Sequence, residues 1–366
     1  MMEEVKEGSV LSVQGDAIKV TEVVKDGDNL TFIIISQKLS GTGEYHVART
    51  YDDFDWLQQH LFSQEDVPGI LGVIFPPLPA KAQANASAKV VKQLGLLALG
   101  DWTLYGAALE RFLQQVASHS VLNKNKAVED FLTSSEAPGR QKSKRNIFGR
   151  LSQAVEEKRK EGHKDVEDFF QNERDLNHSL TNCTKLAAEK FLDVAQTEQK
   201  IAVACEHFSA ALQMCVESGE DKQAFSRVCK TLSEVFNSMG KHMSGVVEND
   251  LNTLGLGLDL ESRYQDSEKE MLFRRTCKLV ELEAATRNAE RAKPVKKPVM
   301  EEVKKTAETE FNQISAVAKN EIKDFKRARV QLLRQALVLW CEKQLVTARN
   351  NAEQLTLHLE TVRGLA

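Results

Sequence analysis

The sequence contains few prolines and few aromatic residues, which argues against a fold built mainly from short strands and tight turns. Only 7 of its 366 residues are proline, and aromatic side chains make up 6%. Proline interrupts helices because it lacks an N–H donor and its ring clashes with the preceding turn. The scarcity of proline therefore favours long, uninterrupted helices. The second half holds only Pro294 and Pro298, and this short basic stretch predicts a corner between two helices.

Closely spaced cysteines, long apolar runs and an N-terminal apolar segment are missing too. The six cysteines never stand at CxxC spacing, so we expect small core residues in a reducing compartment rather than disulfides or zinc ligands. No apolar run approaches 18 residues, and the acidic start MMEEVKEGSV does not resemble a signal peptide. We therefore expect a cytoplasmic protein without a membrane-spanning helix.

Recognisable catalytic motifs are absent as well. The eight histidines are scattered without HExxH spacing, and neither GxxxxGK(S/T) nor GxSxG occurs. The stretch GLGLDL lacks a preceding strand and a third glycine, so it indicates a helix bend rather than a phosphate loop. The net charge of −4 argues against nucleic acid as a partner. The sequence thus predicts no enzyme, no cofactor and no metal site.

The first 135 residues have the pattern of a small α+β domain. Two β-branched runs, at 17–24 and 30–36, are separated by KDGDN, a turn with a central glycine. A third short strand is expected at 44–50. Three adjacent strands of this kind predict a three-stranded antiparallel sheet.

A helix and a proline-rich loop are expected after these strands. The helix covers 51–62, where apolar residues recur at helical spacing. The loop, FPPLPAK at 75–81, holds three prolines and should be stiff and extended. It ends in Lys81, which is placed to touch a lipid headgroup or to border a protein groove. Further short helices should follow and pack on the sheet.

The rest of the chain has the pattern of three long helices. We expect them at about 176–215, 222–291 and 299–362, with a bend in the second at Gly255 and Gly257. Joined by tight turns, they predict an all-α domain of three long antiparallel coiled-coil helices that forms an elongated dimer.

Apolar residues recur every three or four positions along the first and third of these helices, as in a coiled coil. A rod made of these three helices has too much surface for its own core. Dimerisation through the stripe of apolar residues is therefore expected. In the first helix Glu198 occupies a step that the apolar pattern misses. The apolar positions there are Leu176, Leu180, Cys183, Ala187, Phe191, Val194, Ile201, Cys205, Phe208, Leu212 and Cys215; those of the third helix begin at Phe311 and end at Val362.

Three basic clusters are candidates for contact with an anionic membrane, where each Lys or Arg contributes about 1 kcal/mol. The first is a short amphipathic helix before the rod, which alternatively packs on its neighbour as a linker. The other two lie at the predicted corner and along the third long helix, where a solvated face is the alternative. Their residues are Lys144, Arg145, Ile147, Phe148, Arg150 and Leu151; Lys293, Lys296 and Lys297; and Lys319, Lys323, Lys326, Arg327 and Arg329.

These features together resemble a PX–BAR sorting nexin. The first half is similar in the order of its elements: the sheet, YDDFDWL, the proline loop ending in lysine, and LERFLQQVASHSVL. The second half is similar, more specifically, to the subgroup that contains sorting nexins five and six. The stretches that carry this likeness are DVEDFFQNERDL, LFRRTCKLVELEAATRNAERAK, AKNEIKDFKRARVQLLRQAL and ARNNAEQL.

The resemblance implies a PX domain at 10–134, a linker with the basic amphipathic helix at 135–162, and a BAR domain at 163–366. It implies a retromer-associated protein, peripheral on early endosome membranes and tubules, that senses or generates curvature and sorts cargo from the endosome to the trans-Golgi network. The implied partners are anionic or phosphoinositide membranes and a protein like sorting nexin one or two as BAR heterodimer partner. Cargo receptor tails, retromer and dynactin are further implied partners.

Compared with a phosphoinositide-binding PX domain, this sequence has a degenerate pocket made of Arg49, Tyr51 and Lys81. Thr50 stands where the family has an arginine for the phosphate, and Arg49 is one residue early, on the opposite face of a strand. Tyr105 stands where a second arginine is usual. Weak or atypical phosphoinositide binding is therefore expected.

The subgroup's long helical hairpin after the proline loop has no room here, so the binding of cargo tails stays open. An alternative function is a coiled-coil adaptor that binds cargo tails or motor-complex subunits and has little membrane affinity of its own.

Overall fold

The computed structural model describes residues 11–26, 29–64, 67, 69–79, 102–138, 162–214 and 223–364. The chain forms two compact units. The first unit joins the N-terminal sheet and its helices to helical residues up to Thr184 and to Leu260–Arg329. The second is built mainly from Lys185–Asp259 and the residues from Val330 onward. The predicted modules at 10–134, 135–162 and 163–366 stay predictions.

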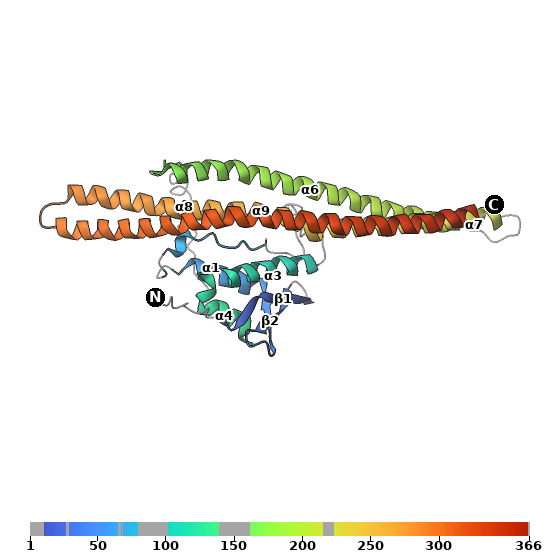
Figure 1. The fold of residues 1–366 in the computed structure, drawn as a ribbon, viewed down its shortest axis with the longest axis horizontal. Coiled ribbons are helices and arrows are strands. Elements are labelled where there is room, and N and C mark those ends of the chain that lie inside the picture. The colour runs from blue at the N-terminus through green and yellow to red at the C-terminus, as the bar shows by residue number, and fades with distance from the viewer. Residues whose placement is uncertain are drawn as a thin grey trace, which may run out of the picture. The chain divides into compact units, whose positions relative to one another are not determined.

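The sheet has the three antiparallel strands that the β-branched runs predict, in the order β1-β2-β3. It consists of β1 (Val13–Asp26), β2 (Asn29–Lys38) and β3 (Glu44–Thr50), drawn in blue in Figure 1. Residues alternate between the two faces of a strand, and Phe32, Ile34 and Ser36 of β2 are all fully buried. One face of β2 therefore forms the floor of the domain core.

Short helices complete this core with aromatic side chains. The ring of Phe54 contacts those of Phe32 and Phe131, with centroids 5.9 Å and 5.1 Å away. Edge-to-face packing of this kind adds to the burial of apolar area. The elements are α1 (Tyr51–Phe62), the 3-10 turn η1 (Ile70–Gly72), α3 (Trp102–Ser118), the 3-10 turn η3 (Leu122–Lys124) and α4 (Lys126–Thr133).

The long helices agree closely with the sequence prediction. They are α6 (Asp168–Met214), α7 (Gln223–Asp250), α8 (Leu256–Arg291) and α9 (Lys297–Arg363). A π-helical turn, η5 (Leu251–Gly255), joins α7 directly to α8 at the predicted bend. The short corner between α8 and α9 contains Pro294, and Pro298 lies in the first turn of α9, where proline is tolerated.

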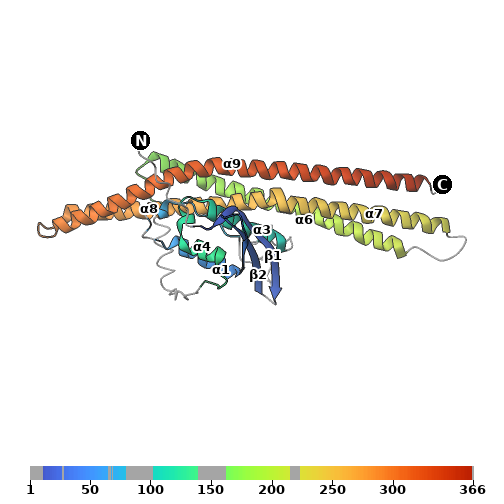
Figure 2. The ribbon, with the colours of Figure 1, turned by 60° about the horizontal axis from the view of Figure 1, so that its bottom comes forward.

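In the first unit, α8 and the first part of α9 run side by side, as Figure 1 and Figure 2 both show. Their core continues into the N-terminal domain, because Ile74, next to the proline loop, is buried with the apolar side chains of three long helices. The cluster consists of Ile74, Phe170, Met271, Leu272, Ala318 and Ile322.

In the second unit, small residues let α6 and α7 approach closely. The Ser209 hydroxyl donates to the Ser233 carbonyl oxygen at 2.8 Å, and the Ser233 hydroxyl donates to the Ser209 carbonyl oxygen at 3.0 Å. A Cβ atom on Gly240 would lie 3.2 Å from the carbonyl oxygen of Ala202. The inner face of α6 is therefore lined by small side chains, including Ala195, Ala202 and Ser209.

Large apolar side chains of α6 lie on its outer surface instead. Val194, Ile201 and Phe208 are 49%, 46% and 45% exposed. They belong to the stripe that the sequence predicts, which we call the α6 stripe: Leu176, Leu180, Ala187, Phe191, Val194, Ile201 and Phe208. On α9 the predicted stripe begins buried, at Phe311 and Ile314, and ends exposed. Much of the predicted apolar pattern is thus left uncovered within the single chain.

Candidate functional site

Arg49, predicted as part of a degenerate lipid pocket, is a core residue. It is 1% exposed, and its guanidinium donates to the carbonyl oxygens of Phe131, Ala48 and Ser134 at 3.1 Å, 2.9 Å and 2.5 Å. Burial lowers its pKa, against the raising effect of Asp53. The assignment of Arg49 to the lipid pocket is therefore corrected: its donors are used inside the domain.

The two positions where the family has phosphate-binding arginines have structural roles here. The backbone N–H and the hydroxyl of Thr50 both donate to Oδ2 of Asp53, at 2.7 Å and 2.8 Å, and close the first turn of α1. Tyr105 is 2% exposed and stacks on Phe32 at 5.6 Å. Neither residue supplies a cation at these two positions, and the expected weak phosphoinositide binding stays a prediction.

Tyr51 contacts the proline loop. Its hydroxyl donates to the carbonyl oxygen of Pro79 at 2.7 Å, and burial, with a contribution from Asp55, raises its pKa to about 12. The side-chain amide of Gln58 donates to the carbonyl oxygen of Pro76 at 3.2 Å. Two side chains of α1 therefore hold the loop from one side. Lys81 lies outside the described residues, so its predicted lipid contact stays a prediction.

The other side of the loop lies against α8 and α9. Arg274 donates to the carbonyl oxygens of Leu71 and Val73 at 3.0 Å and 2.7 Å, and it lies 5.2 Å from the ring of Phe75. The backbone N–H of Ile74 donates to the carboxylate of Glu321 at 3.1 Å. Residues 74–77 and 79 are buried. The described part of the loop, expected to face a membrane or a groove, thus forms an internal contact between the N-terminal domain and the long helices.

Two glycines make this contact possible. Gly69 has a φ of +77°, a left-handed conformation that favours glycine. At Gly72 a Cβ atom would lie 2.6 Å from the carbonyl oxygen of Ile314 and 3.1 Å from the backbone nitrogen of Ala318. Because both obstacles belong to the backbone of α9, a side chain at Gly72 can be accommodated only if the loop moves away from the helix.

Gly72→Ala is accordingly expected to lower the free energy of unfolding by about 1–3 kcal/mol, as overpacking does in other cores. Denaturant unfolding of the full chain measures this change. Gly162→Ala is the matched control, because nothing lies within 4 Å of the Cβ position of Gly162. Equal transition midpoints for the two variants would show that the loop does not need its close approach to α9.

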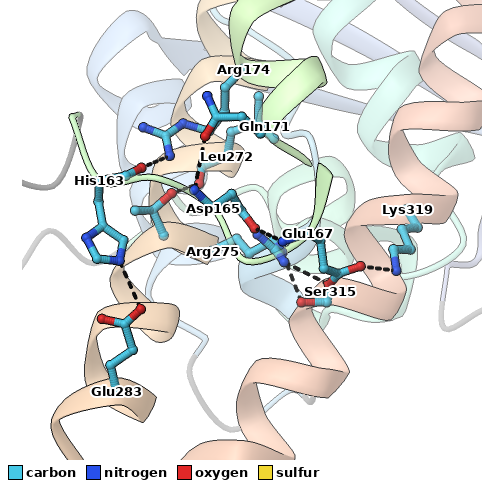
Figure 3. Close-up of polar contacts among 11 residues, drawn as sticks. His163, Asp165, Glu167, Gln171, Arg174, Leu272, Arg275, Glu283, Ser315 and Lys319 are labelled. Carbon is cyan, nitrogen blue, oxygen red and sulfur yellow. Dashed lines mark hydrogen bonds and ion pairs between the residues drawn. The ribbon is translucent and has the colours of Figure 1, made fainter. Parts of the chain in front are cut away.

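A buried arginine connects the start of α6 to α8 and α9, as Figure 3 shows. Arg275 is 1% exposed and donates to Asp165 at 2.5 Å, to Glu167 at 2.9 Å and to the Ser315 hydroxyl at 2.9 Å. The plane of Phe170 lies under the guanidinium, 3.4 Å away. Every part of this cation is thus engaged, by two carboxylates, a hydroxyl and an aromatic ring.

Neighbouring contacts in Figure 3 extend the network around Arg275. His163 lies 3.1 Å from Glu283 of α8, and Lys319 of α9 donates to Glu167 at 2.5 Å. Burial by itself raises the pKa of Glu167. The hydrogen bonds and charges of Lys319 and Arg275 outweigh this effect, so the pKa is lowered. The chain that enters α6 is therefore held on both α8 and α9.

The predicted basic cluster along α9 is partly used inside the protein. Besides Lys319, Lys326 pairs with Glu173 of α6 at 2.6 Å, and Arg329 pairs with Glu261 of α8 at 2.9 Å. Arg329 is only 17% exposed in its side chain. Lys323 and Arg327 are exposed. Ion pairs with other elements of the chain thus take up three of the five predicted membrane contacts on α9.

The corner between α8 and α9 offers a more accessible basic surface. Lys293, Lys296 and Lys297 are all exposed, and Val295 between them is 90% exposed. Val299, just beyond, is 60% exposed. An apolar side chain surrounded by lysines suits the interface of an anionic bilayer. The first predicted cluster, Lys144, Arg145, Ile147, Phe148, Arg150 and Leu151, lies outside the described residues.

Other kinds of site are not found in the described part of the chain. The five cysteines described are free, and no group of three or more His, Cys, Asp or Glu side chains there could hold a metal ion. None of the described helices is long and apolar enough to cross a membrane.

Comparison with known families identifies the N-terminal fold. The family model "PX domain" matches residues 37–135, which span the end of β2 through α4. The part of the chain from the end of β2 to the end of α4 is therefore similar to a PX domain.

Nearly the whole chain is similar to two sorting nexins. Sorting nexin-6 of Homo sapiens is 25% identical over 394 residues, which cover 97% of this chain and 94% of that protein. Sorting nexin-32 of Mus musculus is 25% identical over 395 residues, covering 97% and 95%. Among solved structures, the cryo-EM structure of the SNX-BAR Mvp1 tetramer has a TM-score of 0.49 at 15% identity and covers 94% of this chain and 99% of that one. The PX match and the relatives confirm the resemblance to PX–BAR sorting nexins near sorting nexin six.

Proposed function

We propose that the protein is a non-catalytic sorting nexin that acts on the surface of early endosome membranes and tubules. There it senses or generates curvature as a BAR dimer and helps to sort cargo from the endosome to the trans-Golgi network. Its similarity to sorting nexins over 97% of its length supports this role. The observation that carries membrane contact is the exposed corner, where Val295 lies among three lysines.

Dimerisation is the second part of the proposal. The α6 stripe leaves Val194, Ile201 and Phe208 nearly half exposed, although apolar side chains of this size are usually buried. A second long-helix chain would cover them. The resemblance implies a heterodimer with a protein like sorting nexin one or two, and a second copy of this chain offers the same apolar face.

The lipid contact is proposed to be mainly electrostatic. The three corner lysines of each chain give six in a dimer, and each contributes about 1 kcal/mol near an anionic leaflet. Lys323, Arg327 and the segment 144–151 are proposed as further contacts. Phosphoinositide binding by the PX domain is proposed to be weak, because Arg49, Thr50 and Tyr105 are all engaged inside the domain.

Replacing Lys293, Lys296 and Lys297 by Glu is expected to abolish co-sedimentation with anionic liposomes, since it reverses the charge of the corner. In a matched control, Glu replaces Lys200, Lys230 and Lys343, which are also exposed. The two variants therefore have the same net charge. The control should bind like the wild-type protein. Equal losses in both variants would contradict a specific corner contact and indicate a response to net charge alone.

A coiled-coil adaptor with little membrane affinity is the second candidate. Two observations favour it: the described part of the proline loop is buried, and Lys319, Lys326 and Arg329 are held in ion pairs. Co-sedimentation at low salt with electron microscopy of the liposomes separates the two functions. Pelleted protein and tubulated liposomes support the remodelling function. Protein that stays in the supernatant, alone and with its dimer partner, overturns it in favour of the adaptor.

A further inference from the structure

The corner between α8 and α9 consists only of cationic and apolar residues. From Arg291 to Met300 the sequence reads RAKPVKKPVM, with four Lys or Arg, no acidic residue and no uncharged hydrogen-bonding side chain. Turns in solvent usually contain Asn, Asp, Ser or Gly, because these residues hydrogen-bond the turn's own backbone or adopt positive φ. None of them occurs here, so the composition of the corner is that of a segment at a membrane interface rather than of an ordinary solvated turn.

Pro294 and Val295 form the apex of this corner. The backbone N–H groups of Lys296 and Lys297 both donate to the carbonyl oxygen of Lys293, at 2.9 Å and 3.0 Å. These bonds close a tight turn in which Pro294 takes the second position and Val295 the third, and the proline ring fixes φ. The apex is therefore held in one backbone conformation, and ordering it on a partner costs little conformational entropy.

Both side chains of the apex are exposed. Val295 is 90% exposed, and Pro294 is exposed as well. In Figure 1 and Figure 2 the corner lies at the end of the α8–α9 pair, and no other described element of the first unit lies beside it. A single exposed valine is common on protein surfaces and by itself indicates nothing. This one projects from a rigid turn, with Lys293 before it and Lys296 and Lys297 after it.

A lipid surface fits this arrangement better than a protein groove does. The apex is a convex projection of two residues, and a bilayer can open around such a projection without offering a pocket of matching shape. The lysines can keep their ammonium groups among anionic headgroups while the apex enters more deeply. An unpaired backbone donor is costly away from water, and Pro294 has no N–H to leave unpaired.

We propose that Pro294 and Val295 insert between the lipid headgroups of an anionic membrane as a small apolar wedge. The wedge makes the corner prefer strongly curved membranes, whose headgroups are spread apart. The inference rests on the proposed membrane contact of the corner lysines and adds an apolar component to it. Salt screens the attraction of the lysines, whereas it does not screen the burial of valine. Burying one valine side chain corresponds to roughly a tenfold change in affinity.

Co-sedimentation of the full chain with vesicles of phosphatidylcholine and phosphatidylserine tests the wedge. Val295→Ser keeps the charge of the corner and is expected to lower the affinity for small sonicated vesicles roughly tenfold. The ratio of wild-type to variant affinity should stay constant as sodium chloride is added, because the lost component is apolar. The preference of the wild-type protein for small over large vesicles of this composition should shrink in the variant.

Val346→Ser is the matched control for this variant. Val346 is 55% exposed and lies on α9, away from the corner in the sequence. The substitution therefore makes the same chemical change on another exposed surface. This variant should bind both vesicle sizes like the wild-type protein. Equal losses in Val295→Ser and Val346→Ser would refute a specific role of the apex.

A tryptophan at the apex measures its depth directly. In Val295→Trp the affinity for vesicles should rise, because indole suits the membrane interface. Lipids brominated on their acyl chains should quench this variant more than the wild-type protein, whose three tryptophans provide the background. Pelleting without added quenching would leave the apex in water. That result refutes insertion and indicates an acidic protein as the partner of the apex.

The outcomes separate this inference from the proposed function. If the wild-type protein stays in the supernatant with every vesicle at low salt, the proposed membrane function fails and the wedge fails with it. If Val295→Ser pellets as well as the wild-type protein, while replacing Lys293, Lys296 and Lys297 by Glu abolishes pelleting, the corner is an electrostatic contact only. The proposed function then stands, and the wedge is refuted.

Discussion

Arg275→Met is expected to lower the free energy of unfolding by about 3–5 kcal/mol, the range found when one partner of a buried ion pair is removed. Arg275 is 1% exposed, and so is the side chain of Asp165, to which it donates. Methionine has a similar length and keeps much of the contact with Phe170. The loss therefore comes mainly from Asp165, which would remain buried without a cation, and from the unpaired Ser315 hydroxyl.

Denaturant unfolding of the full chain measures this loss, and a double-mutant cycle assigns it. Asp165→Asn in the Arg275→Met background removes the uncompensated charge and should restore part of the stability. Arg291→Met is the control on the same helix, because Arg291 is exposed at the end of α8. If Arg275→Met unfolded within about 1 kcal/mol of the wild-type protein, Asp165 would have to be neutral or solvated in the folded state.

Local patterns predicted most of the elements of this fold. β-branched runs marked the three strands, and Gly255 and Gly257 marked the bend, which is a π-helical turn in the structure. Gly257 has a further reason to be glycine, because a Cβ atom there would lie 2.8 Å from the Cβ of Ala336. Helix lengths and the α8–α9 corner followed from the rarity of proline.

The contacts between distant segments could not be predicted in this way. Arg274 and Glu321 bond to backbone atoms of the loop around η1, about 200 and 247 residues away in the chain. Periodicity shows which residues share a helix face, but not which segment covers that face. The pair Arg274–Arg275 between apolar neighbours in LFRRTCKLV was the available signal, since a charged pair on an apolar face needs buried partners.

The same limit explains the mixed outcome for the predicted membrane contacts. Lys319, Lys326 and Arg329 looked like a free basic run, because their acidic partners Glu167, Glu173 and Glu261 lie on other elements. The corner lysines were easier to interpret, because a turn leaves its side chains in solvent whatever packs on the helices.

The largest effect on assembly is expected from Ile201→Asp, which should weaken dimerisation at least about 100-fold, or ~2.7 kcal/mol. Ile201 is 46% exposed in the single chain and lies in the α6 stripe between Val194 and Phe208, which are also exposed. A partner that covers the stripe would bury the new carboxylate without a cation, and in a two-fold dimer this happens twice.

Val203→Asp provides the matched control for this variant. Val203 is on the same helix and is 37% exposed. It follows Ile201 by two residues, so its side chain points away from the α6 stripe. Sedimentation or light scattering of the full chains measures the dissociation constant of the dimer for both variants. Circular dichroism checks that the helix content of each variant is unchanged. Because Ile201 is already half in water, Ile201→Asp should leave the folded monomer intact. Equal weakening by both substitutions would mean that association does not use the α6 stripe, and the exposed apolar side chains of α6 would then need another partner.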